Sequence, residues 1–142
     1  MGVVQRGAAT GAAAALAWAA LEPLAARAFG TRYTDTRLLG GVIARGGRGW
    51  RAAGLAVHVA NGAAAGALFA RAGLRGPAAG FAAAQVEGLL VWPGMALMDR
   101  IHPDRRSGRW PRLLTDRRVF AQEAVMHGLF GILLGLGVRR SP

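Results

Sequence analysis

Four long apolar stretches, almost free of charge, divide the chain. They are residues 7–26, 52–70, 76–98 and 119–138. None carries the charged face that recurs every 3.6 residues on a helix of a soluble bundle, and none alternates with the two-residue period of a strand. Each has about the 20 residues that a transmembrane helix needs. The pattern predicts four membrane-spanning helices, over about residues 7–29, 51–72, 76–98 and 118–138.

The composition supports one membrane domain. The chain has 142 residues, 53% of them hydrophobic, and the four stretches leave too little for a separate soluble domain. We therefore expect residues 1–142 to form an all-α integral membrane four-helix bundle. The absence of cysteine excludes a disulfide framework, a thiolate nucleophile and a cysteine-ligated metal centre. Glu22 and Pro23 argue against a cleaved signal peptide in the first stretch.

The arginines predict the orientation in the membrane. All 18 basic residues are arginine, the net charge is +11, and 13 of the arginines flank the first and third connections between the stretches. Because basic flanks stay in the cytoplasm, these connections should be cytoplasmic and both termini outside, in a multi-pass protein of the cell inner (plasma) membrane. We expect the arginines to meet anionic lipid headgroups, and Trp50 and Trp110 to anchor the interface. Without a groove-reading element or aromatic platforms, nucleic-acid binding is not expected.

Small residues four positions apart predict close helix packing. Gly62 and Gly66 have this spacing in the second stretch, and Gly131 and Gly135 have it in the fourth. Lipid gives helices no hydrophobic drive to associate, so backbones must approach closely to gain dispersion contacts. The partner helix is in the same chain, in a second copy of a homo-oligomer, or in another membrane protein.

Five ionisable residues interrupt the apolar stretches. They are Glu22, His58, Glu87, Glu123 and His127. Counted from the charged residue at each cytoplasmic boundary, they lie at depths of about 7 to 18 Å, at 1.5 Å per residue. Each helix contributes at least one of them to this common layer. Such groups are costly in hydrocarbon and turn toward the bundle interior, so they are candidates for a functional site.

Several interpretations of this Glu/His layer remain open. Glu123 and His127 are four residues apart and share one helix face, which suits proton sharing or chelation. A transition-metal ion held by Glu123, His127 and His58 is one alternative, although the usual bundle motif is Glu-x-x-His, one residue shorter. Haem ligation by the two histidines is disfavoured by the adjacent carboxylates. In the structural alternative, the layer provides only interhelical hydrogen bonds.

No motif of soluble-type catalysis is present. The chain lacks Gly-x-Ser-x-Gly, Walker A and Gly-x-Gly-x-x-Gly sequences, so enzymatic activity is not expected. The tripeptide His102-Pro103-Asp104 also occurs in J-domains, but a short connection cannot supply their helical hairpin. Two function classes remain: handling of protons or a cation at the Glu/His layer, and a non-catalytic scaffold or accessory subunit that docks a partner through glycine-rich helix faces.

The order of features resembles the YagU-like family of bacterial inner-membrane proteins. The matching positions are Trp18, Glu22, Pro23, Arg27, His58, Gly76, Gly80, Pro93, Met95, Leu97, Glu123 and His127. The resemblance covers the membrane spans and not the connections. It implies a small bacterial multi-helix protein of the inner membrane, without an established biochemical activity and loosely linked with acid tolerance.

Overall fold

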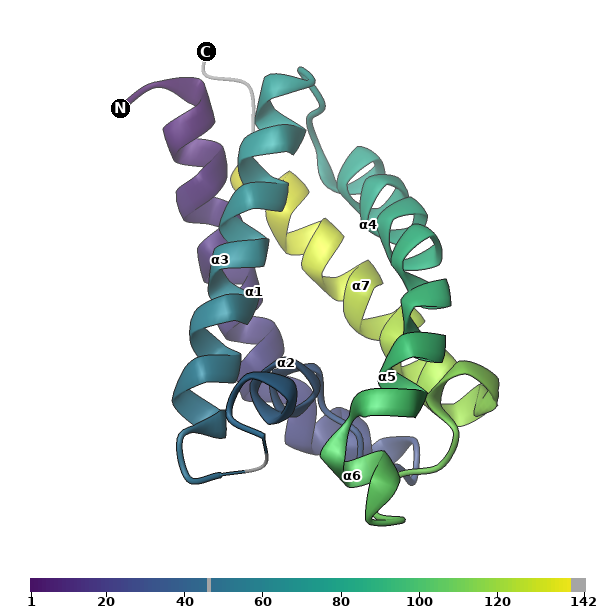
Figure 1. Cartoon of the computed structure of the whole chain (residues 1–142). Helices are drawn as coiled ribbons and strands as arrows, with labels where there is room; N and C mark the ends of the chain where they lie inside the picture. The colour runs from purple at the N-terminus through teal and green to yellow at the C-terminus, as the bar shows by residue number, and fades with distance from the viewer. Residues whose placement is uncertain (46, 139–142) are drawn as a thin grey trace.

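The computed structural model describes residues 1–45 and 47–138, and these residues form helices and connections without strands (Figure 1). Four helical segments are long and apolar enough to cross a membrane. They are α1 (Val3–Ala28), α3 (Trp50–Arg71), α4 (Pro77–Val91) with its continuation to Ile101, and α7 (Arg117–Gly137). The predicted all-α bundle of four candidate membrane spans is confirmed, although the first helix begins at Val3 rather than near residue 7.

The four segments pack as two pairs. Helix α1 lies along α3, helix α4 lies along α7, and α1 also packs on α7 and so joins the pairs. In the part of the chain that the structure describes, α3 and α4 do not pack along each other, and they form the outer edges of the bundle (Figure 1).

Glycines set the close approach within each pair. A Cβ atom on Gly11 would collide with the carbonyl oxygen of Gly62 in α3, and one on Gly80 would collide with that of Gly131 in α7. Gly66 and Gly135 lie in the same two contacts, against Gly7 and Gly76. The small-residue faces thus pack on each other inside this chain.

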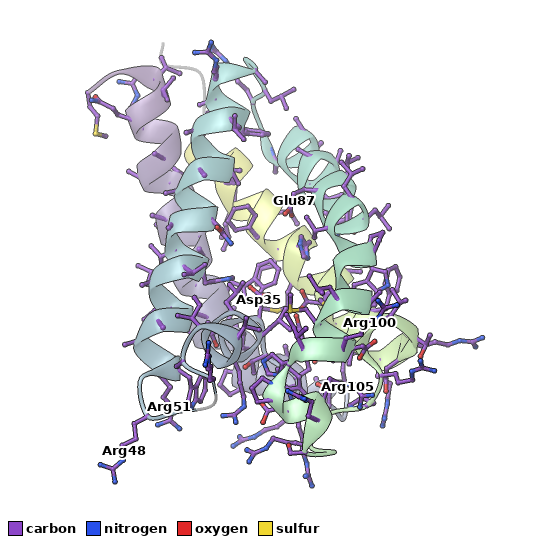
Figure 2. All side chains as sticks on the ribbon, viewed as in Figure 1. Asp35, Arg48, Arg51, Glu87, Arg100 and Arg105 are labelled. Atoms are coloured by element: carbon purple, nitrogen blue, oxygen red, sulfur yellow. The ribbon has the colours of Figure 1, made fainter. Side chains whose placement is uncertain are left out.

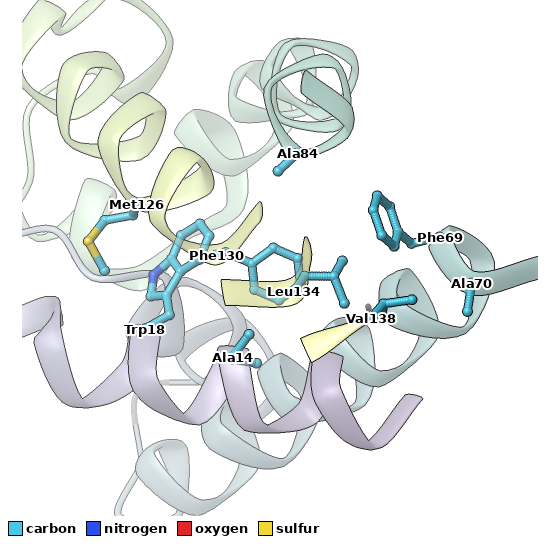
Figure 3. Close-up of a cluster of buried hydrophobic side chains, with 10 residues drawn as sticks. Ala14, Trp18, Phe69, Ala70, Ala84, Met126, Phe130, Leu134 and Val138 are labelled. Carbon is cyan, nitrogen blue, oxygen red and sulfur yellow. The ribbon is translucent and has the colours of Figure 1, made fainter. Parts of the chain in front are cut away.

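Larger side chains fill the space between the pairs. Trp18 of α1 is 5% exposed and packs with Phe130, Met126 and Leu134 of α7 in the main buried cluster (Figure 3). The ring centroids of Trp18 and Phe130 are 6.2 Å apart. This cluster fixes how the α1–α3 pair meets the α4–α7 pair.

The third span changes its helical form at Pro93. Helix α4 ends at Val91, a 3₁₀ turn η1 (Trp92–Gly94) follows, and α5 (Met95–Ile101) continues the span. Proline has no backbone N–H and cannot complete the α-helical hydrogen-bond pattern. The third span therefore passes through a short 3₁₀ segment at this residue.

The first and third connections fold into a cap at the arginine-rich end of the bundle (Figure 2). Its elements are α2 (Asp35–Ile43), α6 (Pro103–Arg106) and η2 (Leu113–Thr115). Helix α2 begins after Thr34, whose side chain accepts a hydrogen bond from the backbone N–H of Arg37. The buried core of the cap includes Tyr33, Trp110 and Leu113.

Trp110 does not anchor the interface as expected. It is 1% exposed, stacks on the His102 ring at a centroid distance of 4.4 Å, and donates from Nε1 to the carbonyl of Arg32 at 2.9 Å. The expectation was wrong because the connection folds back and buries its aromatic residue. Trp50 is partly buried at the start of α3, with the Arg37 guanidinium 4.5 Å from its ring centroid.

Partly buried ion pairs hold the cap together. The Arg37 guanidinium donates to both carboxylate oxygens of Asp104, at 2.5 and 2.9 Å, and so ties α2 to α6. Burial acts to raise the pKa of Asp104, but the hydrogen bonds and charge of Arg37 outweigh it and lower the pKa from 3.8. Asp99 accepts from Arg105 at 2.8 Å and from the Leu113 backbone at 2.7 Å. Several arginines of the connections thus serve the fold itself.

Candidate functional site

A cavity of about 280 Å³ lies between the two helix pairs, next to α2. Its lining comes from α1, α2, α3, α4, α5, α7 and the turn η1. Most of the wall is apolar, but five titratable side chains reach it: Asp35, His58, Glu87, Glu123 and His127. The cavity therefore brings together four of the five predicted layer residues and adds Asp35.

His58 and Asp35 form the first polar pair of the cavity. The Nδ1 atom of His58 lies 2.7 Å from Oδ2 of Asp35, in the first turn of α2. Glycines bring α2 this close to α3, because a Cβ on Gly54 would collide with the carbonyl of Thr36. The other ring nitrogen of His58, Nε2, is buried without a hydrogen-bond partner among the described residues.

His127 lies between two oxygen acceptors. Its Nδ1 is 2.9 Å from the backbone carbonyl of Glu123, and its Nε2 is 3.1 Å from Oε2 of Glu87. A carbonyl oxygen only accepts, so Nδ1 must carry a proton. The 3.1 Å contact then suits a second proton between Nε2 and Glu87, on either the imidazole or the carboxyl group. The geometry thus fits one proton shared by this pair.

Glu123 is the most enclosed carboxyl group of the cavity. The residue is 5% exposed, and its Oε2 is 4.0 Å from Nδ1 of His127. Its Oε1 has no hydrogen-bond partner in the described part of the chain. A buried carboxylate without a partner is costly as an anion. The site therefore favours a proton, a water molecule or a cation next to Glu123.

Glu22 belongs to a different contact. It does not line the cavity; its carboxylate accepts hydrogen bonds from the backbone N–H of Thr36 at 3.0 Å and from the Thr36 hydroxyl at 2.5 Å. It thereby fastens the start of α2 to α1. Glu22 supports the site by positioning the helix that carries Asp35.

Trp18 and Asp35 are site residues that the sequence analysis missed. The Trp18 ring makes edge contacts with His58 and His127, at centroid distances of 5.3 and 4.7 Å, and its Nε1 is buried without a partner in the described residues. The signal for Trp18 was its position one turn before Glu22 on the same face. For Asp35 the signal was Thr34 directly before it, since threonine is a residue type that often begins a helix.

Comparison with known proteins gives no further guide to this site. No protein-family model, curated protein or solved structure matches the chain. What the cavity does must therefore be argued from its own residues.

The described residues do not assemble a metal site. Among them, no group of three His, Asp or Glu side chains is arranged to hold a metal ion. His58 is paired with Asp35 and His127 with Glu87, so the two imidazoles turn to different carboxylates. The set of Glu123, His127 and His58 considered above does not converge on one point, and we derive no metal chemistry from it.

Tyr33 of the cap lies close to this group of carboxylates. It is fully buried, and burial, together with the negative charges of Glu123, Asp35 and Glu22, raises its pKa well above 10. The phenol is therefore neutral and keeps its proton. Gln122 of α7 donates to the Tyr33 carbonyl at 3.1 Å, which holds this residue next to the site.

Proposed function

We propose that this small multi-pass membrane protein takes up and releases protons at the intramembrane cavity formed by Asp35, His58, Glu87, Glu123 and His127. The observation that carries the proposal is the position of His127 between the Glu123 carbonyl and the Glu87 carboxyl group. One proton is shared by His127 and Glu87, and imidazole is the side chain whose charge changes near neutral pH.

The exposure of these groups orders them from the rim of the cavity inward. The Glu87 side chain is 56% exposed, that of His127 is 12% exposed and that of Glu123 is 7% exposed. A proton that reaches Glu87 passes to Nε2 of His127 along the existing 3.1 Å contact. Glu123 then faces the charged imidazolium, which stabilises its carboxylate. Glu87 is the outermost group of the site, and His127 with Glu123 is the inner pair.

The resemblance to the YagU-like family agrees with this proposal. It implies a bacterial inner-membrane protein linked with acid tolerance, where a proton-binding site has an evident use. The inner-membrane location, with the arginine-rich cap in the cytoplasm, is part of the same proposal. The scaffold alternative uses glycine-rich helix faces to dock a partner. The faces that contain Gly62 and Gly131 already pack within the chain, which disfavours this alternative.

Trp18 provides a built-in reporter for a test. An imidazolium ring in edge contact withdraws electron density from an excited indole and quenches its fluorescence. Fluorescence is titrated between about pH 4 and 9, where histidines change charge, on protein in lipid nanodiscs. The Trp18→Phe signal is subtracted to isolate Trp18. We expect a sigmoidal transition that His127→Gln removes or displaces.

Asp116→Asn is the matched control for this titration. Asp116 is a carboxyl group outside the cavity, and asparagine retains the acceptor that caps the start of α7. The control should keep the wild-type midpoint. A Trp18 signal that stays flat over the whole range, or that shifts equally in Asp116→Asn and His127→Gln, would overturn the proposal.

A further inference from the structure

The cavity opens sideways, between the two outer helices. Its lining includes His58 and Asn61 of α3 and Glu87 and Val91 of α4, yet these helices do not pack along each other in the described bundle. Figure 2 shows Glu87 in the space between them. Since both helices are candidate membrane spans, this α3–α4 opening faces the lipid. A molecule dissolved in the bilayer has a direct route to the site.

The charge of the lining selects a cation. Three carboxyl groups, those of Asp35, Glu87 and Glu123, face two imidazoles, and no arginine lines the cavity in the described residues. Even with both imidazoles charged, one carboxylate lacks a counter-charge. An anionic ligand would add to this excess, whereas a single positive charge would neutralise it.

Two buried acceptors lack a donor. In the described part of the chain, neither Oε1 of Glu123 nor Nε2 of His58 has a hydrogen-bond partner. Because Nδ1 of His58 faces the Asp35 carboxylate, Nδ1 holds the proton of the neutral ring and Nε2 accepts. A protonated primary amine carries three N–H donors on one charge, so it can supply a donor to such an acceptor.

The remaining wall accommodates an apolar body. Trp18, Leu38, Met95, Met98 and Phe130 line the cavity, and methionine and aromatic side chains adapt well to varied apolar ligands. A volume of about 280 Å³ is near the lower end for small-molecule sites, so the ligand must be small.

We propose that the cavity binds a small amphipathic amine, with a primary ammonium group against the carboxyl group of Glu123 and an apolar body against Trp18 and the methionines, which enters from the bilayer through the α3–α4 opening. This inference rests on the proposed proton site, since ammonium and proton compete for the same acceptors. It adds a ligand class that proton exchange alone does not require.

The test compares two probes of nearly equal size. Binding of 2-phenylethylammonium and of the uncharged 2-phenylethanol is measured by equilibrium dialysis at neutral pH, with one chain per nanodisc and with empty nanodiscs subtracted. We expect saturable binding of the ammonium and at least about tenfold weaker binding of the alcohol, a difference of about 1.4 kcal/mol. Benzyltrimethylammonium, a cation without N–H donors, should also bind more weakly.

Single-residue variants show which side chains of the cavity bind the ammonium. Glu123→Gln should weaken ammonium binding about tenfold or more, since a charged hydrogen bond is lost. If this variant does not fold, Asp35→Asn provides a second test. The control Asp116→Asn, outside the cavity, should bind as the wild type does. Equal affinity for the ammonium and the alcohol, no saturable binding, or cross-linking that shows a second copy across the α3–α4 opening would each overturn the inference.

The Trp18 titration on the same samples separates the two proposals. A preserved pH transition without ammonium binding removes the ligand inference and leaves the proton site. Loss of both the transition and the binding removes both.

Discussion

The pair of Arg37 and Asp104 should be the strongest single link of the cap. The Asp104 side chain is 7% exposed and that of Arg37 is 19% exposed, and they share two hydrogen bonds. Removing one partner of a buried pair costs about 3–5 kcal/mol, and the partial exposure of Arg37 places Arg37→Ala near 3 kcal/mol. Since Arg37 lies on α2, the loss should also loosen the contact of Asp35 with His58.

Arg109 provides a matched control on the same carboxylate. Its Nε is 3.0 Å from Oδ1 of Asp104, but its side chain is 54% exposed. An exposed pair is worth at most about 1 kcal/mol. Arg109→Ala should therefore change the free energy of unfolding far less than Arg37→Ala.

The assay is a double-mutant cycle. The free energy of unfolding is measured by titrating mixed micelles with a denaturing detergent, with Ala at Arg37, at Asp104 and at both. The cycle cancels the separate contact of Arg37 with Trp50. We expect a coupling energy of about 2–3 kcal/mol for the Arg37–Asp104 pair. A coupling no larger than that of Arg109 with Asp104 would refute this account of the cap.

Three further predictions concern stability. Gly80→Ala should cost about 1–3 kcal/mol because its Cβ meets backbone, whereas Gly94→Ala enters open space and should be neutral or slightly stabilising in thermal unfolding. Burial lowers the pKa of His102 from 6.5, so below about pH 6.5 the unfolded state binds more protons than the folded state. The free energy of unfolding should then fall by up to about 1.4 kcal/mol per pH unit as the pH is lowered, until the folded-state pKa is passed. Unfolding titrations at several pH values should show that His102→Gln removes this dependence. Glu22→Leu should destabilise by about 1–3 kcal/mol through loss of the two Thr36 bonds, and Glu22→Gln by less.

The membrane bundle was predictable because each span is a local property of the chain. Hydropathy over about 20 residues identifies a helix without knowledge of its neighbours. The pairing of the spans was not predictable, because glycine spacing marks a packing face without naming its partner. Gly11 faces Gly62 and Gly80 faces Gly131 only once the whole chain is assembled.

The candidate site was predictable only in part for the same reason. A shared membrane layer indicated His58, Glu123 and His127, but depth says nothing about the direction in which a side chain points. Glu22 has the right depth and turns to Thr36 instead. Asp35 lies outside the apolar stretches and reaches His58 only because its connection folds back as α2.

The protonation state of His127 tests the central claim most directly. Nitrogen-15 chemical shifts of its imidazole, recorded against pH in nanodiscs, report on each ring nitrogen separately. We predict that Nδ1 stays protonated throughout, as donor to the Glu123 carbonyl, while Nε2 gains and loses a proton opposite Glu87. A neutral ring with its proton on Nε2, or a ring that does not titrate, would contradict a proton shared by His127 and Glu87.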